Sequence, residues 1–215
     1  MVILNLVLGF IGLLLGGCQA EKKLSAEECL KQGVSFEESQ QYDQAVRSYT
    51  MALEINPNDA KVYIKRGVAW SKKRDYDKAI ADFSKAVSID PRCVDAYHNR
   101  GIVWSKKENH DQAIADFTKC LEINLRHADA YNNRGVVLAR KGDYDQAIAD
   151  FSKALEIDPF YADAYYNRGI TWIDKGYLQQ ALADIGKALN LKPEDQRINK
   201  AETLLETRIK NFKIE

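Results

Sequence analysis

The stretch that decides the fold is residues 128–161, which read ADAYNNRGVVLARKGDYDQAIADFSKALEIDPFY. In its first half Tyr131, Gly135 and Leu138 recur at steps of four and three residues, which is the spacing of one face of an α-helix. In its second half the same spacing relates the following residues: Ala147, Ile148, Phe151, Ala154 and Leu155. The stretch therefore predicts two helices, one on each side of residues 141–143.

A helix stop and restart are expected at residues 141–143, which read KGD. Gly142 suits the positive φ that commonly ends a helix. Asp143 is a candidate N-cap, and Gln146, three residues later, would complete a capping box. Pro159 then ends the second helix, because proline cannot continue one. The two helices are expected to form an antiparallel pair.

The same pattern recurs along the chain with a period of 34 residues. The recurring small residues are Gly33, Gly67, Gly101, Gly135 and Gly169, with Ala45, Ala79, Ala113, Ala147 and Ala181. Such small side chains are expected where two helix backbones approach closely. The pattern resembles the tetratricopeptide repeat (TPR), and the resemblance implies an all-α fold, a right-handed superhelical α-solenoid of helix pairs. The predicted units are residues 26–59, 60–93, 94–127, 128–161 and 162–195.

Residues 196–215 are predicted to form a capping helix over the last unit, whose apolar face would otherwise meet water. They lack glycine and alanine at the positions where the repeat has them. Apolar residues nevertheless recur at helical spacing among charged ones, namely Ile198, Ala201, Leu204, Leu205 and Ile209. A helix that binds a partner is the alternative interpretation.

The N-terminal residues 1–17, MVILNLVLGFIGLLLGG, carry no charge. This run is shorter than the roughly 20 apolar residues of a membrane span and fits the apolar region of a secretory signal. Leu15-Gly16-Gly17-Cys18 resembles the lipobox of bacterial lipoproteins. The resemblance implies that Cys18 becomes a lipid-modified N-terminus, with residues 18–25 as linker, and that the protein is held in the cell envelope facing the periplasm. Gln19, in place of aspartate, favours the outer over the inner membrane.

The N-terminal segment also departs from the lipoprotein pattern, because no Lys or Arg precedes the apolar run. An uncleaved N-terminal anchor, or a true start upstream of Met1, is therefore an open alternative. Lys22 and Lys23 follow the run, so an uncleaved anchor would leave the following domain in the cytoplasm.

Composition argues against several classes of function. The chain of 215 residues has 31 Lys and Arg against 31 Asp and Glu, and a neutral chain lacks the basic excess that binding to nucleic acid needs. Three scattered histidines and four cysteines without a CxxC pair predict no metal site and no cofactor. Cys29, Cys93 and Cys120 are expected to be free thiols. No phosphate-binding loop or nucleophile motif occurs, so the sequence predicts no enzyme.

The functional surface is expected on the first helix of each unit. In TPR arrays these helices line a concave groove, which the resemblance assigns to positions two, five, six, nine, twelve and thirteen of each unit. Position six is asparagine in three units, and in related arrays this amide binds the backbone of an extended peptide, because it can both donate and accept. The resemblance implies that role for Asn99, Asn133 and Asn167. Ordering of the helix contacts, or exposure to water, is the alternative.

The remaining candidate groove residues are Lys65 at position six, Lys72, Lys106 and Arg140 at position thirteen, and His98, Asn132 and Tyr166 at position five. Aspartates occur at position two, as Asp95, Asp129 and Asp163, and Asp174 replaces the cation at position thirteen of the last unit. A bound peptide is therefore expected to meet alternating charges. In related arrays a dicarboxylate clamp uses positions two, five, six and nine of the first three units. The corresponding residues here are Leu30, Val34, Lys65, Asp95 and Asn99, which do not match that motif.

The sequence therefore predicts a membrane-anchored scaffold that binds a protein or an extended peptide in its groove. Assembly of envelope complexes is one setting for such a scaffold. The alternatives are a non-catalytic adaptor subunit of an enzyme complex and a cytoplasm-facing anchored adaptor. Self-association is also open, since TPR arrays often self-associate.

Overall fold

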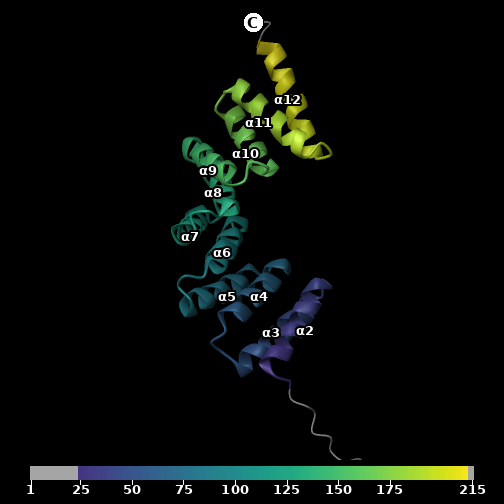
Figure 1. Cartoon of the computed structure of the whole chain (residues 1–215), viewed down its shortest axis with the longest axis vertical. Helices are drawn as coiled ribbons and strands as arrows, with labels where there is room; N and C mark the ends of the chain where they lie inside the picture. The colour runs from purple at the N-terminus through teal and green to yellow at the C-terminus, as the bar shows by residue number, and fades with distance from the viewer. Residues whose placement is uncertain (1–23, 213–215) are drawn as a thin grey trace, which may run out of the picture. The chain divides into compact units, whose positions relative to one another are not determined.

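The computed structural model describes residues 24–212, with side chains to residue 210, and this part of the chain is helical without a strand (Figure 1). The helices are α2 (Ala26–Glu38), α3 (Tyr42–Ile55), α4 (Ala60–Lys72), α5 (Tyr76–Ile89), α6 (Val94–Lys106), α7 (His110–Ile123), α8 (Ala128–Lys141), α9 (Tyr144–Ile157), α10 (Ala162–Asp174), α11 (Leu178–Leu191) and α12 (Gln196–Phe212). The predicted all-α fold of helix pairs with a final helix is confirmed. Cys18 and the predicted signal lie outside the described residues. None of the described helices is long and apolar enough to cross a bilayer.

The chain divides into two compact units, and the first ends at Pro57. Its described part is the pair α2 and α3. Ser25 begins α2 with a capping box, in which its hydroxyl accepts from the Glu28 backbone amide and the Glu28 carboxylate accepts from the Ser25 amide. Tyr49 is fully buried, and its hydroxyl donates to Glu37 Oε2 at 2.7 Å. The pair thus has a small core of its own.

The second unit, from Asn58 onward, contains four stacked helix pairs and α12. Each second helix packs against the first helix of the next pair, as α5 does on α6. The first helices also contact one another in succession, from α4 through α6, α8 and α10 to α12, whereas the second helices do not. The first helices therefore form the inner layer of this stack, as predicted for the side that carries the groove.

The recurring glycine makes room for an aromatic ring. A Cβ added at Gly135 would lie 2.8 Å from Cε1 of Phe151, and one at Gly67 or Gly101 would meet Phe83 or Phe117 in the same way. The expectation of close backbone approach was therefore incomplete, because the nearest obstacle is the side chain of the partner helix. The ring is fully buried where the two helices of a pair face each other.

The turn inside each pair is only partly as predicted. Gly142 has φ 88°, which confirms its role at the end of α8. The predicted capping box at Asp143 is wrong, because the Asp143 side chain makes no capping hydrogen bond. Asp75, at the same place in an earlier pair, does cap its helix by accepting from the Lys78 amide. The shared backbone shape therefore does not depend on one side-chain contact.

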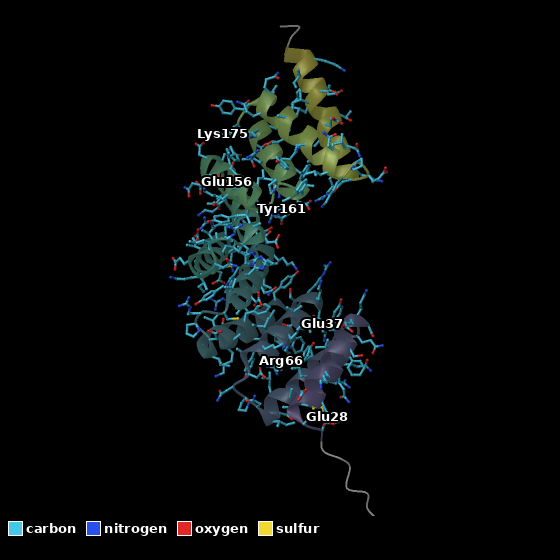
Figure 2. The ribbon with its side chains drawn as sticks, viewed as in Figure 1. Glu28, Glu37, Arg66, Glu156, Tyr161 and Lys175 are labelled. Carbon is cyan, nitrogen blue, oxygen red and sulfur yellow. The ribbon has the colours of Figure 1, made fainter. Side chains whose placement is uncertain are left out.

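An arginine–aspartate pair joins the two helices of every pair in the second unit. Its members are Arg66–Asp82, Arg100–Asp116, Arg134–Asp150 and Arg168–Asp184, and each guanidinium donates to both carboxylate oxygens at 2.7–2.8 Å (Arg66 is labelled in Figure 2). Three of the arginines also donate to a hydroxyl of the preceding pair, on Ser84, Thr118 or Ser152. The four aspartates are buried. Each arginine from α6 onward thus links its own pair to the one before.

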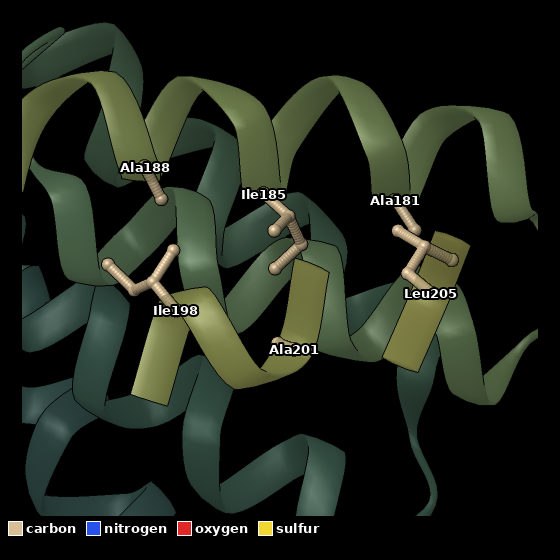
Figure 3. Close-up of a cluster of buried hydrophobic side chains, with 6 residues drawn as sticks. All are labelled: Ala181, Ile185, Ala188, Ile198, Ala201 and Leu205. Atoms are coloured by element: carbon tan, nitrogen blue, oxygen red, sulfur yellow. The ribbon is translucent and has the colours of Figure 1, made fainter. Parts of the chain in front are cut away.

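Helix α12 closes the C-terminal end of the stack. Its Ile198, Ala201 and Leu205 pack against Ala181, Ile185 and Ala188 of α11 (Figure 3). Leu204, which was expected to share this face, is 57% exposed.

Candidate functional site

A continuous groove runs along the inner layer of the second unit; it is called the inner trough here. It consists of four adjoining cavities with volumes of about 460, 240, 260 and 420 Å³. Lys106 and Arg140 line both the first and the second cavity, Val136 and Arg140 the second and the third, and Ile170 and Asp174 the third and the fourth. The trough therefore extends from the end of α4 to α12.

Six of the predicted groove residues line the inner trough, namely Lys72, Lys106, Arg140, Asn133, Asn167 and Tyr166. Four others do not line these four cavities: Lys65, His98, Asn99 and Asn132. Of these, Asn132 is only 6% exposed, so its side chain is part of the support beneath the trough.

The asparagine side chains are connected across successive pairs. Asn167 Nδ2 donates to Asn132 Oδ1 at 2.9 Å, and Asn133 Nδ2 lies 3.1 Å from His98 Nε2. Asn99 instead donates to the carbonyl of Asp95, one turn earlier in its own helix. A peptide backbone at Asn133 or Asn167 would therefore compete with existing hydrogen bonds, and the amides are held at the trough in advance.

His98, which contacts the amide of Asn133, is itself packed against two other rings. Its ring lies 5.9 Å from that of Phe117 and 4.6 Å from that of His127. Burial, followed by the nearby His127, lowers the pKa of His98 to about 4. The imidazole is therefore neutral in the folded protein at neutral pH.

Acid is expected to destabilise the protein through His98. Below pH 6.5 the unfolded chain binds a proton at this residue that the folded chain excludes, so stability is lost as the pH falls from about 6.5 to about 4. The expected loss by pH 4.5 is about 2 kcal/mol. Urea unfolding from pH 7 to pH 4.5 would measure it. His98→Asn, which copies the residue at this position in the next pair, should flatten the curve; an equally steep curve would contradict the assignment.

The trough carries charges of both signs, since Asp174 lines its third and fourth cavities and cations line the first. The position-two aspartates do not line the four cavities: Asp129 accepts a hydrogen bond from the Tyr161 hydroxyl at 2.6 Å, and Asp163 pairs with Lys192 and Arg197. Cations dominate the end of the trough near α4, where Lys72, Lys106 and Arg140 lie together.

Several residues of the site were not predicted from the sequence. Arg74 and Glu108 line the first cavity from the turns after α4 and α6. Gly142 has the same place in the turn after α8. Helical periodicity gives no signal for side chains in a turn. The fourth cavity lies between α10 and α12, and it is lined mainly by apolar side chains that include Ile170, Ile173 and Leu204. Only the docking of α12 creates it.

The described residues offer no site for a metal ion, since no three His, Cys, Asp or Glu side chains gather in residues 24–210. Cys29, Cys93 and Cys120 are free thiols. Burial raises the pKa of Cys120 to about 11, which makes it a poor nucleophile.

Comparisons with known proteins agree with this architecture. Models of the tetratricopeptide repeat match residues 60–93, 94–126, 128–161 and 162–195, and a TPR repeat model matches residues 35–73. A search of curated proteins gives no match.

Solved structures include several similar folds. The crystal structure of YrrB, a TPR protein with an unusual peptide-binding site, has 27% identity and a TM-score of 0.69, over 85% of this chain and 94% of YrrB. The crystal structure of MamA has 25% identity and a TM-score of 0.71, over 80% of this chain and 94% of that one. TTC0263, a thermophilic TPR protein in Thermus thermophilus, shares the fold with 22% identity and a TM-score of 0.66, over 85% of this chain and all of that one. Repeat models, helix pairs and the inner trough together show that this chain belongs to the tetratricopeptide repeat family and has the fold of a protein–protein interaction scaffold.

Proposed function

We propose that this protein is a scaffold that binds an extended segment of another protein in its inner trough and performs no chemistry. The observation that carries the proposal is the continuity of the trough, whose adjoining cavities share their lining residues from α4 to α12. A substrate site is typically one enclosed pocket with convergent polar groups. A long open trough fits a chain instead.

The dimensions of the trough suit an extended peptide. Five successive inner helices border it, and packed helices lie about 8–10 Å apart, so the trough is roughly 30–40 Å long. At about 3.3 Å per residue, that length holds roughly ten residues of extended chain. Amides at Asn133 and Asn167 offer partners for the backbone groups of such a chain. The peptide-binding site of YrrB, a structural relative, supports the same kind of ligand.

The amides are expected to contribute directly to binding. Replacing Asn133 and Asn167 with alanine should weaken partner binding about thirtyfold, because two hydrogen bonds of roughly 1 kcal/mol each are lost. The control is Gln180→Ala with Asn190→Ala, two exposed amides on the second helix α11. Affinity for the partner purified from native cells, measured by calorimetry, would test the role. Unchanged binding by the trough variant, with helicity intact, would contradict it.

We also propose that Cys18 anchors the scaffold by lipid in the cell envelope, facing the periplasm, where it would hold a partner for assembly. The lipobox-like Leu15-Gly16-Gly17-Cys18 supports this proposal. More than one acyl chain on a single cysteine gives a stable anchor, whereas one chain binds only marginally.

Metabolic labelling with a clickable fatty acid tests the anchor. The wild-type chain should incorporate the label, whereas Cys18→Ala should lose it and accumulate as unprocessed precursor. Cys93→Ala, at a partly exposed thiol of the array, should label normally. A wild-type chain that incorporates no lipid would favour an uncleaved anchor, with Lys22 and Lys23 on the cytoplasmic side.

A further inference from the structure

The first cavity of the inner trough is strongly basic; it is called the basic pocket here. Its lining residues are Ser71, Lys72, Arg74, Tyr76, Ser105, Lys106, Glu108 and Arg140. Four cations thus line a cavity of about 460 Å³ whose lining contains one carboxylate, that of Glu108. The whole chain, in contrast, has no net charge. The serine hydroxyls and the Tyr76 hydroxyl add hydrogen-bond donors. The fourth cavity also has cations in its lining, Arg197, Lys200 and Arg208, but most of its other lining residues are apolar.

The cations of the basic pocket have no acidic partner within the described chain. Lys72, Lys106 and Arg140 occupy position thirteen of their units, and neither they nor Arg74 form an ion pair among residues 24–210. The next position behaves differently: Lys107, Lys141 and Lys175 pair with aspartates of the preceding unit, Asp77, Asp111 and Asp145. These three lysines at position fourteen are therefore each paired with an aspartate, whereas the cations at position thirteen line the trough without an acidic partner in the described chain.

Lys106 lies at the centre of this uncompensated charge. Burial, followed by the charges of Lys72 and Arg74, lowers its pKa. Its Nζ lies 6.0 Å from the centre of the Tyr76 ring, which is a weak interaction at that distance. An anion in the pocket would relieve the repulsion that Lys106 experiences.

We propose that the basic pocket binds the carboxylates of an acidic segment in the partner chain. The proposal rests on the proposed function and adds the chemistry of the ligand. It differs from a dicarboxylate clamp, because its cations lie at position thirteen and in the following turn rather than at positions two, five, six and nine.

The spacing of the cations favours an extended acidic segment over a single small anion. Lys72, Lys106 and Arg140 come from the ends of three successive inner helices. Helices packed about 8–10 Å apart match the rise of about 9 Å per turn in an extended polyproline II chain, which has three residues per turn. Acidic residues at every third position would therefore meet one cation each. Beyond Arg140 the same trough continues past Asn133 and Asn167, which suit the backbone of that chain.

The proposal is tested by measuring how two labelled peptides of equal length bind to the full chain, which is kept in detergent. One peptide carries glutamate at every third position among serine and alanine, and the other carries glutamine at those places. Fluorescence anisotropy should show the glutamate peptide binding at least about tenfold more tightly at low salt, with the advantage shrinking as salt rises. Lys106→Gln with Arg140→Gln should abolish the advantage. Lys85→Gln with Lys187→Gln, which removes two exposed cations from second helices, should preserve it.

Three outcomes would overturn the proposal. These are equal affinity for the two peptides, no binding of the glutamate peptide, and an advantage that survives in the Lys106–Arg140 variant. A phosphoserine peptide that binds about tenfold more tightly than the glutamate peptide, through the same two residues, would assign the pocket to phosphate instead. Failure of the glutamate peptide, while the cellular partner still requires Asn133 and Asn167, would remove the acidic-ligand proposal and leave the proposed function standing. Loss of both would remove the proposed function as well.

Discussion

Replacing Asp150 with alanine is expected to lower the free energy of unfolding by about 3–5 kcal/mol, because the Arg134 guanidinium would remain largely buried without its counter-charge. The side chains of Arg134 and Asp150 are only 20% and 9% exposed, and Arg134 Nε donates to Asp150 Oδ2 at 2.7 Å. In the intact pair the hydrogen bond to Asp150 raises the pKa of Arg134. Without Asp150 the guanidinium still keeps its proton, because arginine does not titrate near neutral pH. Urea unfolding followed by circular dichroism would measure the change.

The matched control for Asp150 is Asp145→Ala in the same helix. Asp145 is exposed and pairs with Lys175, and exposed pairs contribute about 0–1 kcal/mol. Replacing both buried partners, as Arg134→Met with Asp150→Leu, should recover much of the stability lost in Asp150→Ala. Equal effects of Asp145→Ala and Asp150→Ala would show that the buried pairs do not hold the helix pairs together.

Leu205→Ala is expected to destabilise the C-terminal end of the array by about 2–5 kcal/mol. Leu205 is fully buried between α12 and α11, so truncation leaves a cavity against Ile185 and Ala181 (Figure 3). Native-state hydrogen exchange should show faster exchange first in α10 and α11, because each unit of a solenoid depends on its neighbours.

Leu204→Ala is the matched control, since it makes the same change at the adjacent residue of the same helix. Leu204 is 57% exposed and lines the fourth cavity, so its truncation should cost little stability. If the two variants lost equal stability, α12 would not be acting as a cap.

The sequence predicted the helix pairs because the 34-residue period repeats the same packing problem. Within one repeat the spacing of Gly135, Gly142 and Phe151 indicates the first helix, the turn and the second helix. The family resemblance also placed the functional surface on the first helices. Of the candidate residues, six line the inner trough that the structure forms.

Other features depend on contacts and backbone conformations that periodicity does not describe. The Arg134–Asp150 pair joins positions 16 residues apart on two helices, and the repeat alone does not distinguish buried charges from solvated ones. Asp143 has the right residue type for a cap, but its side chain makes no capping bond. Arg74 enters the basic pocket from a turn, and its φ of 63° is a left-handed conformation that the sequence does not signal for arginine.

The most direct test of the central claim, that the inner trough holds the partner, is site-specific photo-crosslinking in native cells. A photoreactive phenylalanine analogue at Val136 or Ile170 faces the trough, whereas one at Ala115 or Ala183 is exposed on a second helix. The predicted result is one shared protein adduct from Val136 and Ile170, absent from Ala115 and Ala183 and reduced by the Asn133–Asn167 variant. Adducts that form only from Ala115 or Ala183 would place the partner on the opposite face and contradict the account.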